Sequence, residues 1–337
     1  LEFRRVLFRS PVGDGPFPVV VYGHGINDSR ASGRGVADLL NPLGIAVIAN
    51  DALWHGQHPT ASGDGSLAAL DFLGIKFTPL GVDPLTLRGN FDQTVLDRLQ
   101  LIEAIRETPD VDGDGIADLD IDRVGYFGIS LGGMLGAGFA ALSQDVSAVV
   151  LSVPGGRLLE FVSGSSIIAS FLPALRNIIG SEELFTRLVP VAQALVDPSD
   201  PATMGALILA DRPFGDTPPS LLMPVSVFDE TVPPPTGRAL ARAVGLPQTG
   251  PVFYDVEVIG TVDAPVSGNV AGGEATAAYF QLDWVTSGDG VERSNHNNTP
   301  LGREGAEQAR HFMQTWLDGR PEIIDPYATL GTPPLSE

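Results

Sequence analysis

The sequence predicts an α/β protein with a doubly wound, mostly parallel sheet and a helical cap insertion. Short apolar runs at 18–23, 44–51, 124–129 and 147–153 alternate with helical patterns, which is typical of a parallel sheet. The 337 residues, 43% of them hydrophobic, suffice for one large core. From 158 to 213 the alternation stops, and the pattern becomes helical, unusually apolar and broken by prolines. These observations together favour a sheet protein that carries an inserted helical segment.

The chain divides into a core and a cap. We expect 11–157 and 214–337 to form the core, and 158–213 to form a helical cap or lid above the carboxyl edge of the sheet. Ordinary crossover helices are the alternative, but a single crossover needs far fewer residues. Residues 1–10 differ from the acidic remainder and lack the apolar run and cleavage site of a signal peptide. We expect these ten residues to be a cloning or assembly artefact, with the natural start of the chain missing.

Further elements follow from hydrophobic periodicity and capping residues. A helix is expected to begin at Asn90, with Gln93 completing a capping box. The other expected elements are helices at 32–43, 131–142, 236–244 and 300–318, strands at 221–228 and 252–259, and a loop at 260–278.

Composition excludes several functions. The net charge is −21, from 41 acidic and 20 basic residues, and a nucleic-acid partner is therefore not expected, because phosphate binding needs a basic surface. The absence of cysteine excludes disulfides, thiolate metal sites and a cysteine nucleophile. No apolar run reaches the roughly 18 residues of a transmembrane helix.

A serine at the end of the third apolar run is the candidate nucleophile. Gly128-Ile-Ser130-Leu-Gly132 fits the G-x-S-x-G nucleophile elbow, between a predicted strand and a predicted helix. A sharp turn there exposes the hydroxyl, and the adjacent helix N-terminus favours developing negative charge. A serine in an ordinary tight turn is the alternative.

The base and the acid follow by position. A serine hydroxyl needs a base that takes its proton and an acid that orients this base. Of the five histidines, His296 lies in a polar loop just before the last helix and is the expected base. Asp229 ends a late strand and is the expected acid, with Glu230 as its competitor. The order Ser130, Asp229, His296 is the order that the elbow fold uses.

Other residues are expected around this triad. The backbone N–H of Leu131, just after the nucleophile, and that of Ile26 should form the oxyanion hole, with Asn27 as the alternative second donor. His24 follows the first strand and should shape this loop. His24, Trp54 and His55 are the expected substrate contacts.

The elements His24-Gly25, GISLGG at 128–133, DETVP at 229–233 and His296 resemble the α/β-hydrolase superfamily, over about 18–318. The acidic loop before the elbow is similar to that of bacterial, often secreted, lipase- and esterase-like serine hydrolases. The resemblance implies ester hydrolysis through an acyl-enzyme, no cofactor for the chemistry, and a secreted or extracytoplasmic location. Two departures are the seventeen residues before the His24 strand, too few for the usual preceding strands, and the missing glycine beside His296.

An acidic loop precedes the elbow strand. Its aspartates, at positions typical of calcium loops, are Asp110, Asp112, Asp114, Asp118 and Asp120. Alternating carboxylates around a glycine turn can converge on one hard cation. However, Ile121 stands where a calcium loop of the EF-hand type needs a bidentate Glu. A structural calcium ion and a solvated acidic turn remain the two interpretations.

The function that the sequence predicts is a serine carboxylic-ester hydrolase acting on a small-molecule, lipid or polyester substrate. The apolar cap indicates a hydrophobic acyl group, as do the loop residues Leu53, Trp54, Leu67, Phe72, Ile75 and Phe77. An acyltransferase or a peptidase with the same triad is a second hypothesis. A catalytically inactive binding protein of the same fold is a third.

Overall fold

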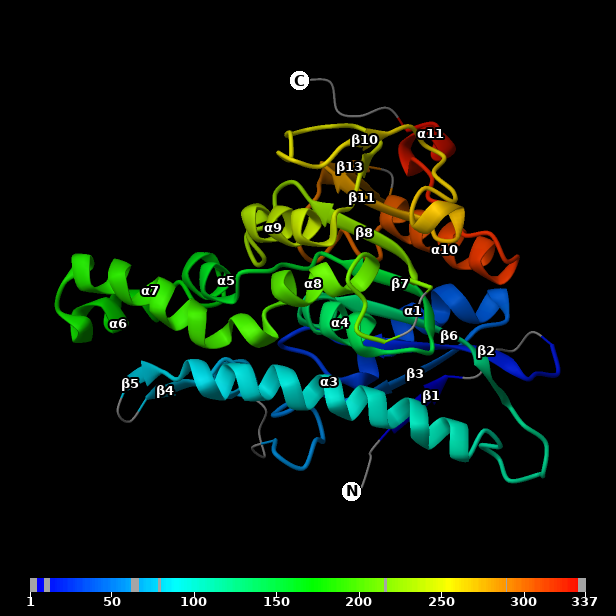
Figure 1. The fold of residues 1–337 in the computed structure, drawn as a ribbon, viewed down its shortest axis with the longest axis horizontal. Helices are drawn as coiled ribbons and strands as arrows, with labels where there is room; N and C mark the ends of the chain where they lie inside the picture. Colours follow the sequence, from blue (N-terminus) through cyan, green and yellow to red (C-terminus); the bar gives the residue numbers. More distant parts are fainter. Residues whose placement is uncertain are drawn as a thin grey trace.

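A nine-stranded sheet forms the centre of the protein (Figure 1). The computed structural model describes residues 5–8, 13–61, 67–77, 80–214, 217–288 and 290–332. The strand order is β1-β3-β2-β6-β7-β8-β11-β9-β10, with every pair parallel except β1 with β3. The strands are β1 (Arg5–Phe8), β2 (Phe17–Gly23), β3 (Ala46–Asn50), β6 (Leu119–Ile129), β7 (Val146–Ser152), β8 (Ser220–Ser226), β9 (Gln248–Thr249), β10 (Thr261–Val262) and β11 (Ala277–Leu282). This mostly parallel sheet confirms the predicted fold class.

Helices cover both faces of the sheet, because each central strand presents apolar side chains to both sides. In β2, Val19 and Val21 belong to one hydrophobic cluster and Val20 and Tyr22 to another. The first cluster is covered by α3 (Pro84–Glu107), α4 (Leu131–Leu142), α8 (Pro201–Leu209) and α9 (Pro234–Val244). The second is covered by α1 (Gly33–Leu40) and α10 (Arg303–Leu317). This double cover explains why the strands read as continuous apolar runs.

Two predicted elements are wrong. The helix expected to begin at Asn90 is α3, which begins at Pro84, with the Asp83 side chain capping the N–H groups of Leu85 and Thr86. Asn90 is buried inside that helix, where its amide donates to the Phe72 carbonyl at 2.8 Å. The strand expected at 252–259 consists of turns and bends, and Val258 is 95% exposed. Its place in the sheet belongs to β11, which begins inside the expected loop at 260–278.

Four helices lie between β7 and β8, in the stretch expected to form the cap. They are α5 (Leu158–Gly164), α6 (Leu172–Ile179), α7 (Glu182–Val196) and α8. The helices α6 and α7 project from the side of the sheet, beside the hairpin of β4 (Ile75–Phe77) and β5 (Leu80–Val82) (Figure 1). By contrast, α8 packs on α4 and α9. Within 158–213, the projecting part therefore ends with α7.

The chain's beginning adds one edge strand. Val6 pairs with Ala49 and Leu7 with Ile48, so β1 extends the sheet beyond β3. Residues 1–4 and 9–12 lie outside the described part, and the origin of 1–10 stays a prediction. Among the described helices, none combines the length and apolarity needed to cross a bilayer.

Candidate active site

Three side chains from separate elements form a hydrogen-bonded chain at the carboxyl edge of the sheet. Nε2 of His296 lies 2.8 Å from Oγ of Ser130, and its Nδ1 lies 2.8 Å from Oδ2 of Asp229. Ser130 follows β6, Asp229 follows β8, and His296 precedes α10. All three residues are buried. The structure therefore brings together the three residues expected to act as nucleophile, acid and base, in the geometry of a serine triad.

The sharp turn at Ser130 depends on close backbone packing. Ser130 has φ 58° and ψ −119°, a strained conformation that costs about 1–3 kcal/mol in a non-glycine residue. A Cβ on Gly132 would lie 1.9 Å from the Gly23 carbonyl oxygen, and one on Gly128 would lie 2.3 Å from that of Gly132. Only glycine fits at these two positions. The close approach of β2 to the elbow thus requires Gly132, and the tight turn of the elbow itself requires Gly128.

His24 holds the peptide group that carries the expected Ile26 donor. The Ala52 N–H donates to Nε2 of His24 at 2.9 Å, so the proton of the neutral ring is on Nδ1. Nδ1 then donates to the Gly25 carbonyl at 2.8 Å. This carbonyl shares a planar peptide with the Ile26 N–H, and in a trans peptide the two point in opposite directions. His24 therefore orients the Ile26 N–H. It is not among the residues that line the pocket at Ser130, which is described below.

His55 and Trp54 are also absent from the residues that line the pocket at Ser130. Nε2 of the buried His55 contacts the Ile26 carbonyl oxygen, and its Nδ1 lies 2.7 Å from the Leu53 carbonyl oxygen. Trp54 donates from Nε1 to Oδ1 of Asn90 at 3.1 Å. The structure thus gives these two expected substrate contacts roles in holding the loop after β3. Leu53, Phe72 and Ile75 are likewise buried in the core, and the Phe77 side chain lies outside the described part.

The catalytic pocket has a volume of about 440 Å³ and a mixed lining. The described residues that line it are Tyr22, Gly25, Ile26, Asn27, Asp28, Ser32, Ile129, Ser130, Ile167, Thr231, His296, Asn297, Pro300 and Leu301. Ile26 is thus at the pocket, as an oxyanion donor must be. Leu131 is the first residue of α4, where a backbone N–H has no partner within the helix. No lysine or arginine is among these lining residues, so the pocket presents no cation to an anionic ligand.

Asparagines fix the loop that carries the base. The Asn295 side chain accepts the N–H groups of Asn297 at 2.9 Å and Asn298 at 3.1 Å, and that of Asn298 accepts the Asn295 N–H at 2.7 Å. Ser294, buried before this turn, donates to the Leu282 carbonyl at 2.6 Å. The asparagine run at 295–298 was the available sequence signal for this turn. It explains how the loop holds His296 without the usual neighbouring glycine.

Backbone and hydroxyl contacts connect the cap to the loop of the acid. Oδ1 of Asp229 accepts the N–H groups of Thr231 and Val232 at 2.9 and 2.7 Å. The Ser165 hydroxyl donates to the Thr231 carbonyl at 2.6 Å, and the Ser166 N–H donates to the Glu230 carbonyl at 2.9 Å. The segment after α5 is therefore fastened directly to the turn that positions Asp229. The sequence analysis did not detect these contacts, which join residues more than sixty positions apart.

The buried His24 predicts a pH dependence of stability. Burial lowers the pKa of His24 from 6.5 to about 3, with a contribution from the neighbouring His55. The unfolded chain thus binds a proton that the folded chain does not, so stability is full above pH 6.5 and falls as the pH drops toward 3. Between pH 7 and 5, His24 should remove about 2 kcal/mol from the free energy of unfolding. Urea unfolding of His24→Gln at both pH values should show a smaller fall; an equal fall would contradict this role.

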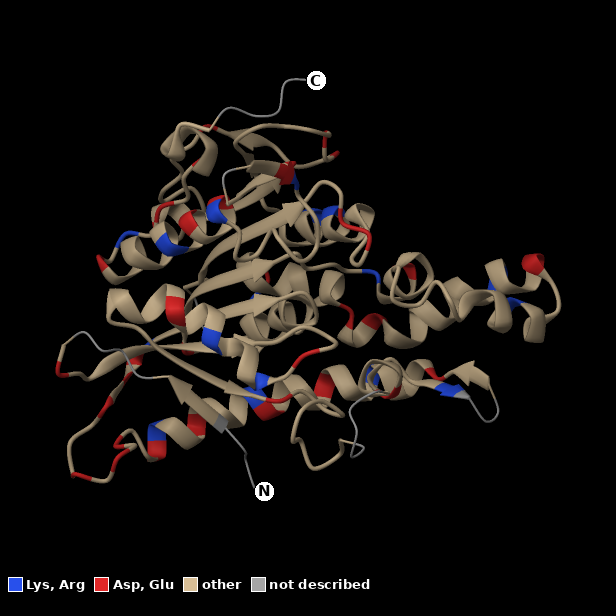
Figure 2. Cartoon of the chain, turned by 180° about the vertical axis from the view of Figure 1, so that it is seen from behind, with Lys and Arg blue, Asp and Glu red and all other residues tan. Residues whose placement is uncertain are grey.

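The acidic loop lies at the other end of β6 from Ser130, about 30 Å away along the strand. Figure 2 shows the run of carboxylates in this loop. Carboxylate oxygens of Asp110, Asp112 and Asp118 lie within 4.8 Å of one another. Asp114 and Asp120 are outside this group: Asp120 pairs with Arg123 at 2.7 Å, and Asp114 accepts the Ile116 N–H at 2.8 Å.

Calcium binding to this loop stays a prediction. Three converging carboxylates are the hard oxygen ligands that Ca²⁺ prefers. Added CaCl₂ should raise the melting temperature, by the equivalent of about 2.7 kcal/mol at a hundredfold excess over Kd. Asp112→Asn should lose this shift, which a melting curve by circular dichroism measures. An equal effect of MgCl₂ or of KCl at matched ionic strength would contradict a specific site.

Known structures share this fold. The Paenibacillus sp. R4 acetyl xylan esterase matches with a TM-score of 0.55 and 16% identity, over 92% of this chain and 77% of that one. Pyrococcus horikoshii acylaminoacyl peptidase matches with a TM-score of 0.53 and 15% identity, and puromycin hydrolase with 0.53 and 16%. These matches cover 94% and 99% of this chain but 39% and 38% of those proteins. No protein-family model and no curated protein matches the sequence. The chain has the α/β-hydrolase fold.

Proposed function

We propose that the protein is a serine hydrolase that cleaves carboxylic esters through an acyl-enzyme. The observation that carries this proposal is the continuous hydrogen-bonded chain from Ser130 through His296 to Asp229. A serine hydroxyl becomes an effective nucleophile only when such a base is within reach. The proposal is supported by a fold that solved esterases and peptidases share.

In the proposed reaction, Oγ of Ser130 attacks the ester carbonyl while Nε2 of His296 takes its proton. Asp229 accepts the Nδ1–H and stabilises the imidazolium that forms. The N–H groups of Leu131 and Ile26 stabilise the negative charge on the carbonyl oxygen. His296 then protonates the leaving alcohol, and water, activated by the same histidine, hydrolyses the acyl-enzyme. Apart from the ester and water, these steps use only groups of the chain itself.

The lining of the catalytic pocket favours a neutral or cationic substrate over an anionic one. Among the described residues that line it, Asp28 alone carries a carboxylate, and the exposed Asn27 and Asn297 offer amide groups. The nearby Arg30 is engaged with Asp51 and Gln57 and so does not offset Asp28. The net charge of −21 acts in the same direction.

We also propose a secreted or extracytoplasmic location, because the acidic loop before Ser130 resembles that of secreted bacterial hydrolases.

Ester turnover by the purified protein tests this function. The protein should hydrolyse neutral p-nitrophenyl esters and should be labelled at Ser130 by a fluorophosphonate probe, which reacts with activated serines. Hydrolysis of matched p-nitroanilides at an equal rate would indicate a peptidase. Transfer products in the presence of added alcohol would indicate an acyltransferase. Failure of the folded protein to react with either ester or probe would favour an inactive binding protein.

A further inference from the structure

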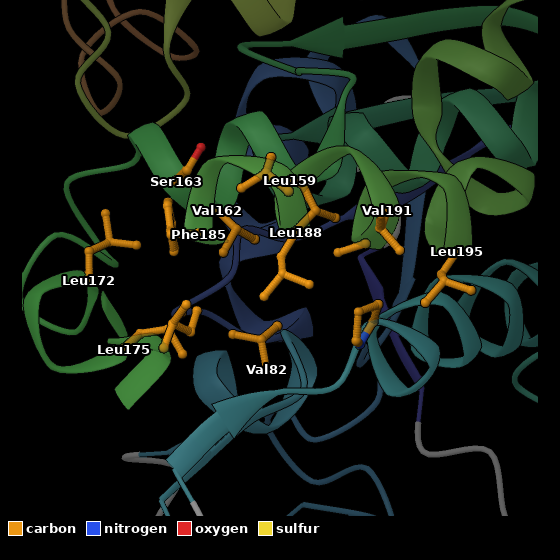
Figure 3. Close-up of a pocket in the computed structure, with 14 residues that line it drawn as sticks. Val82, Leu159, Val162, Ser163, Leu172, Leu175, Phe185, Leu188, Val191 and Leu195 are labelled. Atoms are coloured by element: carbon orange, nitrogen blue, oxygen red, sulfur yellow. The ribbon is translucent and has the colours of Figure 1, made fainter. Parts of the chain in front are cut away.

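A second cavity lies between the projecting helices and the hairpin beneath them (Figure 3). Its volume is about 280 Å³, near the lower end of the range of roughly 300–1,000 Å³ for small-molecule sites. Its lining comes from β5, the start of α3, α5, α6 and α7: Val82, Pro84, Leu159, Val162, Ser163, Leu172, Leu175, Ile179, Phe185, Leu188, Val189, Val191, Ala192 and Leu195. Apart from the Ser163 hydroxyl these side chains are apolar, and none carries a charge.

This lining defines the chemistry of an occupant. A polar or charged group placed here would lose hydrogen bonds to water, and among the lining side chains only the Ser163 hydroxyl could replace one of them, which is unfavourable. Only one lining residue, Phe185, is aromatic, so the walls are formed almost entirely by branched aliphatic side chains. An aliphatic chain suits this lining because each methylene that leaves water for the cavity contributes a favourable transfer free energy, and no polar group is desolvated.

One short segment contributes side chains to the linings of both this cavity and the catalytic pocket. Ser163 and Leu172 line the cavity, while Ile167, between them in sequence, lines the catalytic pocket. The same segment is fixed to the acid loop by the hydrogen bonds of Ser165 and Ser166. The segment that lies between Ser163 and Leu172 therefore borders the catalytic pocket at Ile167 and is fastened to the turn that carries Asp229.

We propose that this cavity is the acyl-chain site of the enzyme. An ester whose carbonyl lies at Ser130 would extend its aliphatic acyl chain past Ile167 and along α5 into the space between α7 and β5. This inference rests on the proposed ester hydrolysis and specifies its substrate as an ester with an aliphatic chain longer than acetyl. Each methylene that enters the cavity should raise kcat/KM about fourfold.

The test is a comparison of p-nitrophenyl octanoate with p-nitrophenyl acetate. Ala192 lines the cavity from α7, so Ala192→Trp fills part of it and should lower the octanoate-to-acetate ratio of kcat/KM about tenfold or more. Leu188→Trp, from the same helix and the same wall, should lower this ratio as well, and it serves if Ala192→Trp does not fold.

Ala194→Trp is the matched control. Ala194 is on α7 two positions from Ala192, is exposed, and does not line the cavity, so its ratio should equal that of the wild type. The wild type and the three variants could all hydrolyse esters through Ser130 with the same octanoate-to-acetate ratio of kcat/KM. That result would overturn the acyl-chain site and leave the proposed function intact. Absence of any ester hydrolysis by the wild type would instead overturn the proposed function. A change of oligomeric state in Ala192→Trp, seen by light scattering without a change of ratio, would assign the cavity to contact between copies and overturn the inference.

Discussion

Ser130→Ala is expected to lower kcat for a p-nitrophenyl ester by roughly 10⁶-fold, the loss that removal of a triad serine causes. The attacking oxygen is lost, so no acyl-enzyme can form, and only the oxyanion donors and binding contacts still act on the ester. The measurement is initial-rate kinetics at saturating substrate, with intact-protein mass spectrometry to detect the acyl-enzyme in the wild type.

Folding of this variant needs separate control because Ser130 has a strained backbone. Alanine adopts φ 58° no more readily than serine does, so the melting temperature should change little. The rate loss then reports chemistry and not unfolding. Equal rates of wild type and Ser130→Ala, with both folded by circular dichroism, would place the nucleophile elsewhere.

Asp229→Asn is expected to lower kcat by about 10⁴-fold with little change of structure. The asparagine oxygen can still accept the N–H groups of Thr231 and Val232, as Oδ1 of Asp229 does. Its amide would instead face Nδ1 of His296 as a donor, which forces the imidazole proton onto Nε2. In that tautomer His296 cannot accept the Ser130 proton. Steady-state kinetics and the melting temperature of the purified variant test this prediction.

Glu230 provides the matched control for the acid. It follows Asp229 directly and is exposed, and the contact that the structure records for it is its backbone carbonyl with the Ser166 N–H. Glu230→Gln should therefore retain kcat within about twofold. It should also change the free energy of unfolding by no more than about 0.5 kcal/mol, as is usual for a surface substitution. A large loss in Glu230→Gln with a small one in Asp229→Asn would exchange the two assignments.

Much of the fold could be predicted because its local signals agree with its tertiary structure. The runs that form β2, β3, β6 and β7 are apolar on both faces, bounded by glycines or polar residues, and alternate with helices. Ser130 and Asp229 could be chosen because a parallel sheet brings the ends of its strands to one edge. His296 could be chosen because it is the one of the five histidines that lies in a polar loop just before the last helix. Their hydrogen-bond geometry could not be predicted, since it depends on how three loops fold.

The two failed predictions have different physical causes. Val252–Ile259 is richer in β-formers than Ala277–Leu282, yet the second segment lies between β8 and β9 in parallel register. Strand propensity describes how well a residue fits a half-buried pleated surface, and position in the sheet decided between these segments. The start of α3 was misplaced for another reason. Gly89 weakens the helical pattern just before Asn90, but the residues that begin the helix are Asp83 at the N-cap and Pro84 at its first position.

The hydrogen bonds from Ser165 and Ser166 to Thr231 and Glu230 limit how the helical insertion can change during evolution. A helical insertion that is joined to the sheet only by its two ends can be replaced by another insertion in a related protein without disturbing the sheet. Here the insertion is also hydrogen-bonded to the turn that carries Asp229, the proposed catalytic acid. A new insertion would have to supply a hydroxyl donor to the Thr231 carbonyl and a backbone N–H to the Glu230 carbonyl. Otherwise the turn that carries Asp229 would lose these two hydrogen bonds. Substrate preference and catalytic geometry would therefore evolve together in this protein.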